Sequence, residues 1–310
     1  MGARTGYFKK SLSHFQPQDR HLIYDLISQL KANYPVKKLC ELFELSRSAY
    51  YAYCKQDLTQ TTKDKIDLAN ELERLFYYHK RRYGSRRLCA ALKDEGYEVG
   101  RYKVRSLMRA RSLQAIQPKS FVPRTTIVDN ARARSPNLLL EMANLPTAVN
   151  QVVVGDITYL ASENGWLYLA VWMDLFSRYI VSWQFDQHMK ADLVSTAFEK
   201  LIHNRRPPPK LIVHSDGGTQ YKAGLLRQMI QRYGYRQSMT RRDNHYDNAF
   251  VESLFSRLKA ELLEGQPIFR NKRHAQFEVF DYIEGYYNTE RKHSSLNYLS
   301  PMEFERQANS

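Results

Sequence analysis

The sequence contains few cysteines and no long apolar run, and these two absences exclude several classes of protein. Cys40, Cys54 and Cys89 are widely spaced and form no CxxC motif, so we expect neither a disulfide framework nor a zinc site. No apolar run approaches the roughly 20 residues that cross a bilayer. The N-terminal "MGARTGYFKK" lacks the apolar segment of a secretory signal. These features predict a soluble, intracellular protein with reduced thiols.

Acidic residues are scarce in the first half of the chain. Residues 1–150 contain 27 Lys and Arg against 14 Asp and Glu, whereas residues 151–310 contain 20 against 18. With 43% hydrophobic residues, 22 Tyr and 14 Phe, the chain can form a core and is not expected to be disordered. The charge pattern predicts that the basic half binds a polyanion and the neutral half has another task. A generally basic soluble protein is the simpler alternative.

Residues 1–60 are expected to be helical. "HLIYDLISQLKANY" has apolar residues at helical spacing, and "PVKKLCELFELSRSAYYAYCK" reads as two short helices with a break near Leu45-Ser46. This layout is a helix-turn-helix pattern, and Ser46 is a suitable N-cap for its second helix. That helix would present Arg47, Ser48, Tyr50 and Tyr51 to DNA. A plain helical hairpin with no DNA role is the alternative.

Residues 61–116 form a second helical unit with a strongly basic surface. "KDKIDLANELERLFYYHK" is amphipathic, and "EGYEVG" separates the two helices that follow it. Tyr83, Tyr97 and Tyr102 lie among the basic residues, as is common where a protein follows a sugar-phosphate backbone. The predicted DNA-binding residues here are Arg81, Arg82, Arg86, Arg87, Arg101, Lys103, Arg105, Arg109 and Arg111. A solvated helix face is the alternative reading. Residues 117–150, with Pro118, Pro123 and Pro136, read as a basic linker.

From residue 151 to 310 the pattern changes to alternating strands and helices. "NQVVVGDITYL", "GWLYLAVWMDLFS" and "RYIVSWQFD" are β-rich runs joined by short turns, as antiparallel neighbours are. "KLIVHS" and "YRQSMT" are two further strands, each preceded by a helix. "YDNAFVESLFSRLKAELLEG" and "KRHAQFEVFDYIEGYYN" read as long helices. The expected fold is therefore a mixed α/β sheet of about five strands flanked by helices.

Three acids in this region are candidates for a shared site. Asp156 lies in the first strand, Asp216 ends the fourth strand, and Glu252 lies on a polar face of the first long helix, which it shares with Lys259. If the two strands are neighbours, their carboxylates repel each other by roughly 4 kcal/mol at an effective dielectric near 20. Such a pair requires a shared proton or a cation, and Mg²⁺ bound by carboxylates suits phosphate chemistry. Gly217 and Gly218 would then let a substrate backbone approach.

Each of these acids has an ordinary structural explanation when it is considered alone. Asp216 can be a turn acid, Asp156 a strand acid and Glu252 a solvated helix acid. His214 is expected to pack or orient rather than to bind a metal. Asp243 and Asp247 are expected near a helix N-terminus, where acids are favourable, and Asp174 is a further nearby acid.

The segments around the three acids resemble the transposases of the insertion-sequence-three family. They are "DITYL" at Asp156, "HSDGGTQY" at Asp216 and "YDNAFVESLFSRLKAEL" at Glu252. With 35 residues between the last two acids, the spacing is also similar to the D, D(35)E arrangement of retroviral integrases. "YNTERKHSSLNYLSP" and "YGSRRLCAALKDEGYEVGRYKVRSLMRARSLQ" resemble the same family. The likeness covers residues 80–306.

The resemblance implies an RNase H-like core, preceded by all-α helix-turn-helix-like DNA-binding units. It implies that Asp156, Asp216 and Glu252 are catalytic ligands of two Mg²⁺ ions, for which Mn²⁺ can substitute. The expected reaction is hydrolysis of a phosphodiester at the element's end, followed by attack of the freed 3′-OH on another phosphodiester. Lys259 would contact the terminal nucleotides, and Asn248 would support the turn before the catalytic helix. Arg291 and His293 would touch DNA or pack the C-terminal helix.

The resemblance also implies partners and a place of action. The partners are double-stranded DNA, both the terminal inverted repeats and the target, and a dimer or larger assembly on that DNA. The expected location is the bacterial cytoplasm, at the nucleoid, with no membrane association. Family members commonly act as a fusion with an upstream product that carries a leucine zipper. This sequence has no heptad run of three or more repeats, so it either needs an upstream partner or uses its own N-terminal helices.

Two other functions are consistent with the same residues. One is a catalytically silent DNA-binding regulator of transposition, against which the intact acid triad argues. The other is an RNase H-type nuclease that hydrolyses without joining, against which the basic N-terminal half argues. The products separate the three functions, because they are joined strands, bound but uncut DNA, and nicked ends alone.

Overall fold

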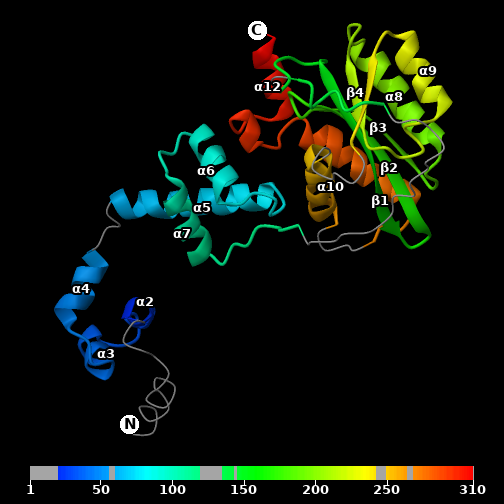
Figure 1. Ribbon diagram of the computed structural model, residues 1–310. Helices are drawn as coiled ribbons and strands as arrows, with labels where there is room; N and C mark the ends of the chain where they lie inside the picture. Colours follow the sequence, from blue (N-terminus) through cyan, green and yellow to red (C-terminus); the bar gives the residue numbers. More distant parts are fainter. Residues whose placement is uncertain are drawn as a thin grey trace. The chain divides into compact units, whose positions relative to one another are not determined.

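The computed structural model describes residues 20–55, 60–118, 135–142, 145–241, 249–263 and 268–309 (Figure 1). The chain divides into two compact units, residues 1–70 and 71–310. The boundary falls within helix α5 (Gln60–Tyr78). Each unit has its own packing and is described by itself. Among the described residues, no helix combines the length and apolar character of a membrane span.

The first unit contains three short helices, α2 (Arg20–Leu30), α3 (Val36–Leu42) and α4 (Arg47–Lys55). Its small core is made of Tyr24, Ile27, Leu39, Cys40 and Tyr50. Tyr50 is only 1% exposed, which corrects its predicted place on the DNA-facing surface. The side chain is needed in the core because three short helices bury few other large residues.

The helical part of the second unit contains the C-terminal half of α5, α6 (Ser85–Asp94) and α7 (Arg101–Ala110). Their apolar stripes bury Leu72, Leu75, Phe76, Leu88, Leu92, Val104 and Met108. Six residues join α6 to α7, and Gly96 begins this connection with a φ of 87°. That left-handed conformation is easily adopted by glycine, which has no Cβ.

The sheet of the second unit has five strands, and this confirms the predicted mixed α/β fold. They are β1 (Val152–Ser162), β2 (Gly165–Asp174), β3 (Ile180–Asp186), β4 (Ile212–Ser215) and β5 (Arg236–Met239). Their order is β3-β2-β1-β4-β5. The first three are antiparallel neighbours, while β4 is parallel to β1 and β5 to β4. The parallel crossover places β4 beside the first four residues of β1, so that the end of β4 lies next to the interior of the central strand.

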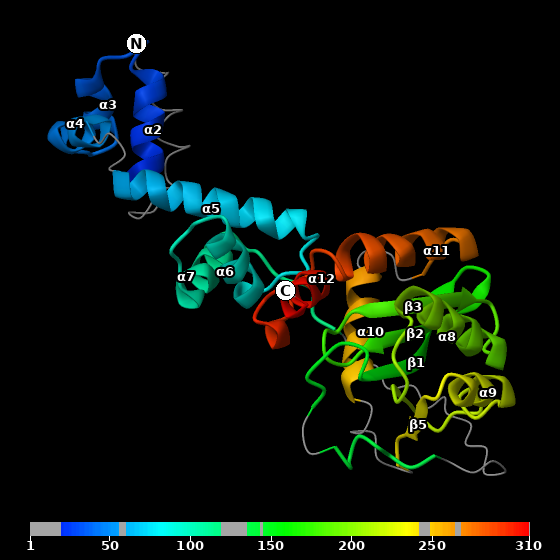
Figure 2. The same cartoon turned by 90° about the horizontal axis from the view of Figure 1, so that it is seen from above.

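Helices cover both faces of the sheet, as Figures 1 and 2 show. On one side lie α8 (Ala191–Arg205) and α9 (Gly224–Arg232), whose apolar residues join the main core around Trp172 and Phe198. On the other side α10 (Ala249–Leu262) runs past β1. Leu254 and Leu258 of α10 are buried, as the sequence pattern predicts. This arrangement leaves the polar face of α10 near the strand ends.

The C-terminal segment differs from the predicted single long helix. It consists of α11 (Lys272–Phe280), the π-helical η3 (Asp281–Tyr287), the short η4 (Ser294–Leu296) and α12 (Pro301–Ala308). Four aromatic or aliphatic side chains of η3 are buried, namely Tyr282, Ile283, Tyr286 and Tyr287. The wider turn of a π-helix changes the side-chain spacing, and here it accompanies the burial of three tyrosines within six residues.

The end of the predicted linker packs on the core. Pro136 accepts a backbone hydrogen bond of 3.2 Å from Met239 in β5, and the Leu138 amide donates to the Ser238 hydroxyl at 2.9 Å. Leu138 itself is buried. These contacts satisfy backbone groups at the outer edge of β5, which would otherwise be an open sheet edge. Part of the predicted linker therefore covers the edge strand of the sheet.

Candidate active site

The register between β1 and β4 brings two of the predicted acids together. The last parallel pair is Gly155 with Ser215, and the next residue on each strand is an aspartate. Asp156 and Asp216 therefore lie side by side where β4 ends. Gly155 is required at this point because a Cβ there would lie 2.3 Å from the Trp172 ring. In β1, Gly155 therefore faces the buried Trp172 ring, and the next residue, Asp156, points to the opposite face of the sheet.

The Asp156 carboxyl is the most perturbed acid of the site. Burial raises its pKa well above the ordinary value, and the nearby Asp216 and Glu252 carboxylates raise it further. The Ile157 amide donates to Asp156 Oδ1 at 2.8 Å, which opposes the increase, as does the charge of Lys259. Three acids and one lysine from β1, β4 and α10 therefore act on the same small volume. A cation in this volume would stabilise the ionised carboxylates.

Asp216 is oriented by the glycine loop that follows it. The Gly218 amide donates to Asp216 Oδ1 at 2.9 Å. A Cβ at residue 218 would also lie 2.9 Å from this oxygen, closer than real Cβ contacts allow. The glycine therefore lets the loop fold back onto the carboxylate. This is a structural reason for Gly218 besides the predicted approach of a substrate backbone.

Tyr221 is a further residue of the site, and the sequence analysis did not identify it. Its ring is 2% exposed and contacts Trp172 edge-on, with 5.8 Å between ring centroids. Burial raises the pKa of the phenol well above its ordinary value, and the charges of Asp156 and Asp216 act in the same direction. Tyr221 is therefore a neutral, buried side chain next to the two aspartates. Its place at the end of "HSDGGTQY" was the only available signal.

Glu252 and Lys259 approach the pair from α10. Glu252 is exposed in the first turn of the helix. The Lys259 ammonium lies 4.0 Å from the Tyr159 ring centroid. Burial lowers the pKa of Lys259, and the Asp156 charge partly opposes this. Within the described part of the chain, no three Asp, Glu, His or Cys side chains converge closely enough to hold a metal ion. Glu252 is thus near the aspartates without joining them.

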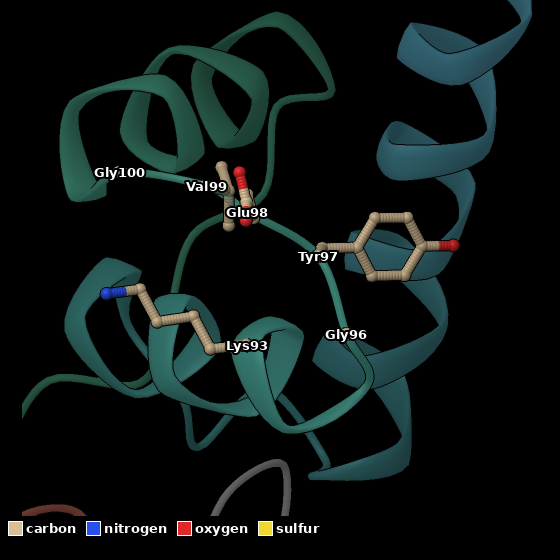
Figure 3. Close-up of a pocket in the computed structure, with 6 residues that line it drawn as sticks. All are labelled: Lys93, Gly96, Tyr97, Glu98, Val99 and Gly100. Carbon is tan, nitrogen blue, oxygen red and sulfur yellow. The ribbon is translucent and has the colours of Figure 1, made fainter.

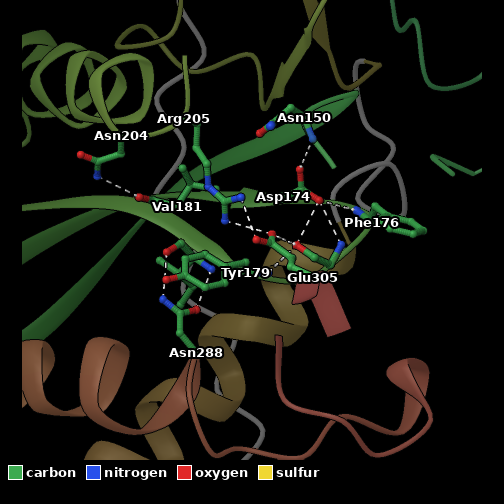
Figure 4. Close-up of polar contacts among 11 residues, drawn as sticks. Asn150, Asp174, Phe176, Tyr179, Val181, Asn204, Arg205, Asn288 and Glu305 are labelled. Carbon is green, nitrogen blue, oxygen red and sulfur yellow. Dashed lines mark hydrogen bonds and ion pairs between the residues drawn. The ribbon is translucent and has the colours of Figure 1, made fainter. Parts of the chain in front are cut away.

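Two other candidate residues, His214 and Asp174, form hydrogen bonds within the protein. His214 is fully buried, and its Nδ1 lies 2.8 Å from the Ser238 hydroxyl, as expected of an orienting histidine. Asp174 accepts hydrogen bonds from the amides of Asn150, Phe176 and Ser177 at the end of β2 (Figure 4). Asp174 is therefore a structural acid. Asp243, Asp247 and Asn248 lie outside the described residues.

The predicted DNA-binding residues fall into two groups. The first group is exposed, four of its members on α7: Arg81, Arg86, Arg101, Lys103, Arg105 and Arg109. Tyr102, next to Arg101, is 85% exposed. Arg81 is exposed although its guanidinium also donates to the Gln114 carbonyl at 3.4 Å. Arg111 pairs with Glu73 instead. The basic face of α7 is therefore the strongest candidate for DNA contact.

The second group consists of basic residues whose side chains contact other parts of the protein, and for Arg291 and His293 this is the packing alternative of the prediction. Arg291 is 2% exposed and forms a two-pronged ion pair with the buried Glu261, at 2.9 and 2.7 Å. Burial lowers the pKa of His293 well below its ordinary value, with the Arg291 charge acting in the same direction. Its ring is therefore neutral. Arg291 is therefore buried within the protein, whereas His293 is half-buried beside it.

Arg82 and Arg87 make the same kind of contact from the helical part. Arg82 donates to the Glu261 carbonyl at 3.3 Å, and its guanidinium lies 4.5 Å from the Tyr286 ring centroid. Arg87 donates to the Lys292 carbonyl at 2.8 Å. A guanidinium suits such sites because it combines planar stacking with several donors.

Tyr83 completes this connection between the helical part and the core. Its hydroxyl donates to the Glu290 carbonyl at 3.1 Å and accepts from the Lys292 amide at 2.8 Å. We call this set of contacts the clasp, and define it by Arg82, Tyr83 and Arg87 on one side and Glu261, Glu290 and Lys292 on the other. Because Glu261 lies at the end of the helix that carries Glu252 and Lys259, the clasp holds the C-terminal end of α10.

One hollow among the described residues lies in the helical part of the second unit. It has a volume of about 460 Å³ and is formed at the turn between α6 and α7, where the side chains of Tyr97 and Lys93 point in different directions (Figure 3). Its lining residues are Lys93, Gly96, Tyr97, Glu98, Val99 and Gly100.

Comparison with known proteins agrees with this geometry. Two models described as an integrase core domain match residues 146–245 and 233–301, and a model described as an HTH-like domain matches residues 63–121. The chain is 34% identical over 289 residues to the transposase InsF of insertion sequence IS3A from Escherichia coli, covering 91% of this chain and 98% of that protein. The chain belongs to the insertion-sequence-three family of transposases.

A second relative of this transposase comes from Lactococcus lactis. It is the transposase for insertion sequence element IS904, 37% identical over 239 residues that cover 77% of this chain and 93% of that protein. Among solved structures, the simian T-cell lymphotropic virus intasome in complex with a PP2A regulatory subunit matches with a TM-score of 0.43 and 15% identity. The match covers 76% of this chain and 74% of that chain.

The HTLV-2 integrase catalytic core domain in complex with magnesium is a further solved structure similar to this transposase. The TM-score is 0.40 and the identity 16%, over 51% of this chain and 98% of that chain. Family membership confirms the predicted fold class and enzyme class. The transposase is a polynucleotidyl transferase with an integrase-type core and an HTH-like domain.

Proposed function

We propose that Asp156, Asp216 and Glu252 are the catalytic acids of this transposase. The observation that carries the proposal is the β1–β4 register, which places Asp156 beside Asp216 with the polar face of α10 next to them. Two half-buried carboxylates side by side are unfavourable without a cation. Their side chains offer only oxygen donors, which are the ligands that Mg²⁺ prefers. The donor set therefore fits a divalent metal ion.

Asp156, Asp216 and Glu252 would hold two Mg²⁺ ions, for which Mn²⁺ can substitute. When bound, such ions activate the attacking oxygen and stabilise the leaving oxygen of a phosphodiester. The chain's own residues orient the two aspartates and neutralise a phosphate of the DNA. The Ile157 and Gly218 amides orient the two aspartates through hydrogen bonds. The buried Tyr221 ring would exclude water from the inner side of the pair. Lys259 would bind a phosphate of the DNA end.

The proposed reaction has two steps and no covalent enzyme intermediate. In the first, water attacks the phosphorus at the element's end, the bond to the 3′ oxygen breaks, and a 3′-OH and a 5′-phosphate form. In the second, that 3′-OH attacks a target phosphodiester, a new phosphodiester forms, and the target's 3′ oxygen leaves with a proton. Both steps need positioning and charge stabilisation rather than a protein nucleophile.

The element's ends would be bound by α7. In a helix-turn-helix the second helix enters the major groove, where Arg is well suited to guanine. Arg101, Tyr102 and Arg105 are exposed on this helix and spaced to share one face. Lys103 and Arg109 would bind phosphates. We place the DNA-bound assembly, a dimer or larger complex, at the nucleoid, with an upstream product of the same element as a candidate partner.

The test uses labelled duplexes that carry the inverted repeats flanking this gene. Purified protein with Mg²⁺ is expected to nick the ends and then to join strands. Glu252→Gln, which keeps the side-chain size and removes the charge, is expected to bind the same DNA with no nicking. Ser253→Ala, next to it and also exposed, is the matched control and should retain activity.

The outcomes of this experiment separate the three functions. Loss of nicking with Glu252→Gln and with chelator supports the transposase site. Nicked ends without joined strands would favour a hydrolysis-only nuclease. Binding without cleavage by the wild type would favour a regulator or a missing upstream partner, and nicking by Glu252→Gln would remove Glu252 from the ligand set.

A further inference from the structure

We propose that α3 and α4 form a second DNA-reading unit, which gives this transposase two separate readers for each element end. The matched HTH-like domain covers residues 63–121 and leaves this helical pair unassigned. The proposal rests on the proposed binding of the element's ends and adds a second contact to it. The ligand is duplex DNA, and the element that reads it is α4.

The geometry of the pair is that of a helix-turn-helix. α3 and α4 are seven and nine residues long, and residues 43–46 form the turn. Figure 2 shows α2, α3 and α4 grouped together, and side chains from all three helices form the unit's core. A third helix packed behind a short helical pair is the arrangement that supports a recognition helix in DNA-binding proteins. The pair is therefore held rigidly enough to enter a groove.

The turn has a specific backbone conformation. Glu44 has a φ of 53°, in the left-handed region, and the Leu45 amide donates to the Cys40 carbonyl at 2.9 Å. This backbone bond closes the end of α3 and reverses the chain within four residues. Helix-turn-helix turns often contain glycine at such a position. The chain keeps the turn although glutamate is strained there, because the packing of Leu39, Cys40 and Tyr50 determines it.

The outer face of α4 carries the chemistry that reads base edges. Arg47, Ser48 and Tyr51 are all exposed, and Tyr51 is 51% exposed. They are spaced one and four residues apart from Arg47, so they share the N-terminal part of one face. Arginine and serine donate to base edges in the major groove, and tyrosine adds a hydroxyl and an apolar ring.

The charge and polarity of this face favour DNA over a protein partner. Lys37 and Lys38 of α3 are exposed and can bind phosphates on either side of the groove. The exposed residues of α4 include no leucine, isoleucine, valine, methionine or phenylalanine among those that the structure describes. The helix α4 also contains no acidic residue, so its face is positively charged and attracts a phosphate backbone.

The experiment is a footprint of the full chain on the labelled inverted-repeat duplex. Wild type is expected to protect two separate patches. The double variant Arg47→Ala, Tyr51→Ala should lose one patch, keep the other, and bind about 10-fold or more weakly, as expected for one lost base contact. Arg105→Ala on α7 should lose the other patch. Lys31→Ala, an exposed basic residue at the end of α2, is the charge-matched control and should keep both patches.

The result that would overturn the proposal is an unchanged footprint and affinity in the double variant. An equal loss of affinity on an unrelated duplex of the same length would also overturn it, because it would show charge attraction without reading. Helical content measured by circular dichroism must match the wild type, and the conservative variant Arg47→Lys should restore part of the affinity. Because no catalytic residue is changed, failure here is distinguishable from failure of the catalytic proposal.

Discussion

The α3–α4 pair and the α6–α7 pair share one motif but differ in their turns and in their attachment. The first turn has four residues with Glu44 in a left-handed conformation, and the second has six with Gly96 in that role. The α6–α7 pair belongs to the same compact unit as the catalytic core, whereas the α3–α4 pair belongs to a separate one. The comparison shows that two different turns can build the same helical pair. The contacts of each pair with the rest of its unit decide whether it can act together with the integrase-type core.

The largest expected effect comes from breaking the buried Arg291–Glu261 ion pair, which lies next to the clasp in the second unit. Arg291→Met leaves Glu261 as a buried charge without its main partner, which costs about 3–5 kcal/mol of unfolding free energy. The second unit should unfold at lower denaturant concentration. Hydrogen exchange in residues 71–310 should quicken, while exchange in residues 20–55 should not change.

The control for this ion pair is Arg205→Met, which removes a different pair with Glu305 at 2.7 Å. Its cost should be smaller because the side chains of Arg205 and Glu305 are 19% and 12% exposed, against 3% and 4% for Arg291 and Glu261. Equal acceleration of exchange in both units after Arg291→Met would contradict the separation of the two pairs.

A smaller effect is expected when the DNA-facing residues of α7 are removed. Arg105→Ala should weaken binding to the inverted repeat by about 1–3 kcal/mol if the side chain contacts a base. Arg109→Ala should weaken binding to every duplex and reduce the salt dependence by about one phosphate contact. Affinity measured across several salt concentrations separates the two cases. Identical behaviour of the two variants would mean that α7 binds without reading sequence.

The smallest effect concerns the two turns. Glu44→Gly should stabilise the first unit by up to about 1 kcal/mol, because glycine adopts the left-handed conformation without a Cβ clash. Gly96→Ala should destabilise the second pair by a similar amount, although nothing lies within 4 Å of the added Cβ. Thermal unfolding measures both changes. Stability changes of opposite sign in the two variants would support the comparison of the two turns. Destabilisation by Glu44→Gly would contradict it.

The fold was largely predictable because strand and helix periodicity is a local signal. The runs "VVVGDITYL" and "KLIVHS" predict strands, and their pairing follows from the alternation of strands and helices. Asp156 and Asp216 were also predictable, since both end or interrupt buried runs. The roles of Glu252 and Lys259 as a catalytic pair stay a prediction.

The destination of the arginines was not predictable from the sequence. Arg82 and Arg105 have the same side chain in similar basic surroundings, yet Arg82 lies over Tyr286 and Arg105 faces solvent. The difference depends on residues far away in sequence, namely Tyr286 in η3 and the Glu261 carbonyl at the end of α10. Only tertiary contacts decide it. Tyr50 was misplaced for a related reason, because a small unit buries whichever aromatic faces inward.

The clasp also determines where this protein can be cut. A fragment that begins at residue 135 would keep all five strands and all three acids. It would uncover Tyr282 and Tyr286, now 1% and 8% exposed, and would leave the Glu290 and Lys292 backbone without Tyr83. Such a patch favours self-association. The smallest well-behaved catalytic fragment should therefore begin near residue 71, well before the integrase-type domain itself.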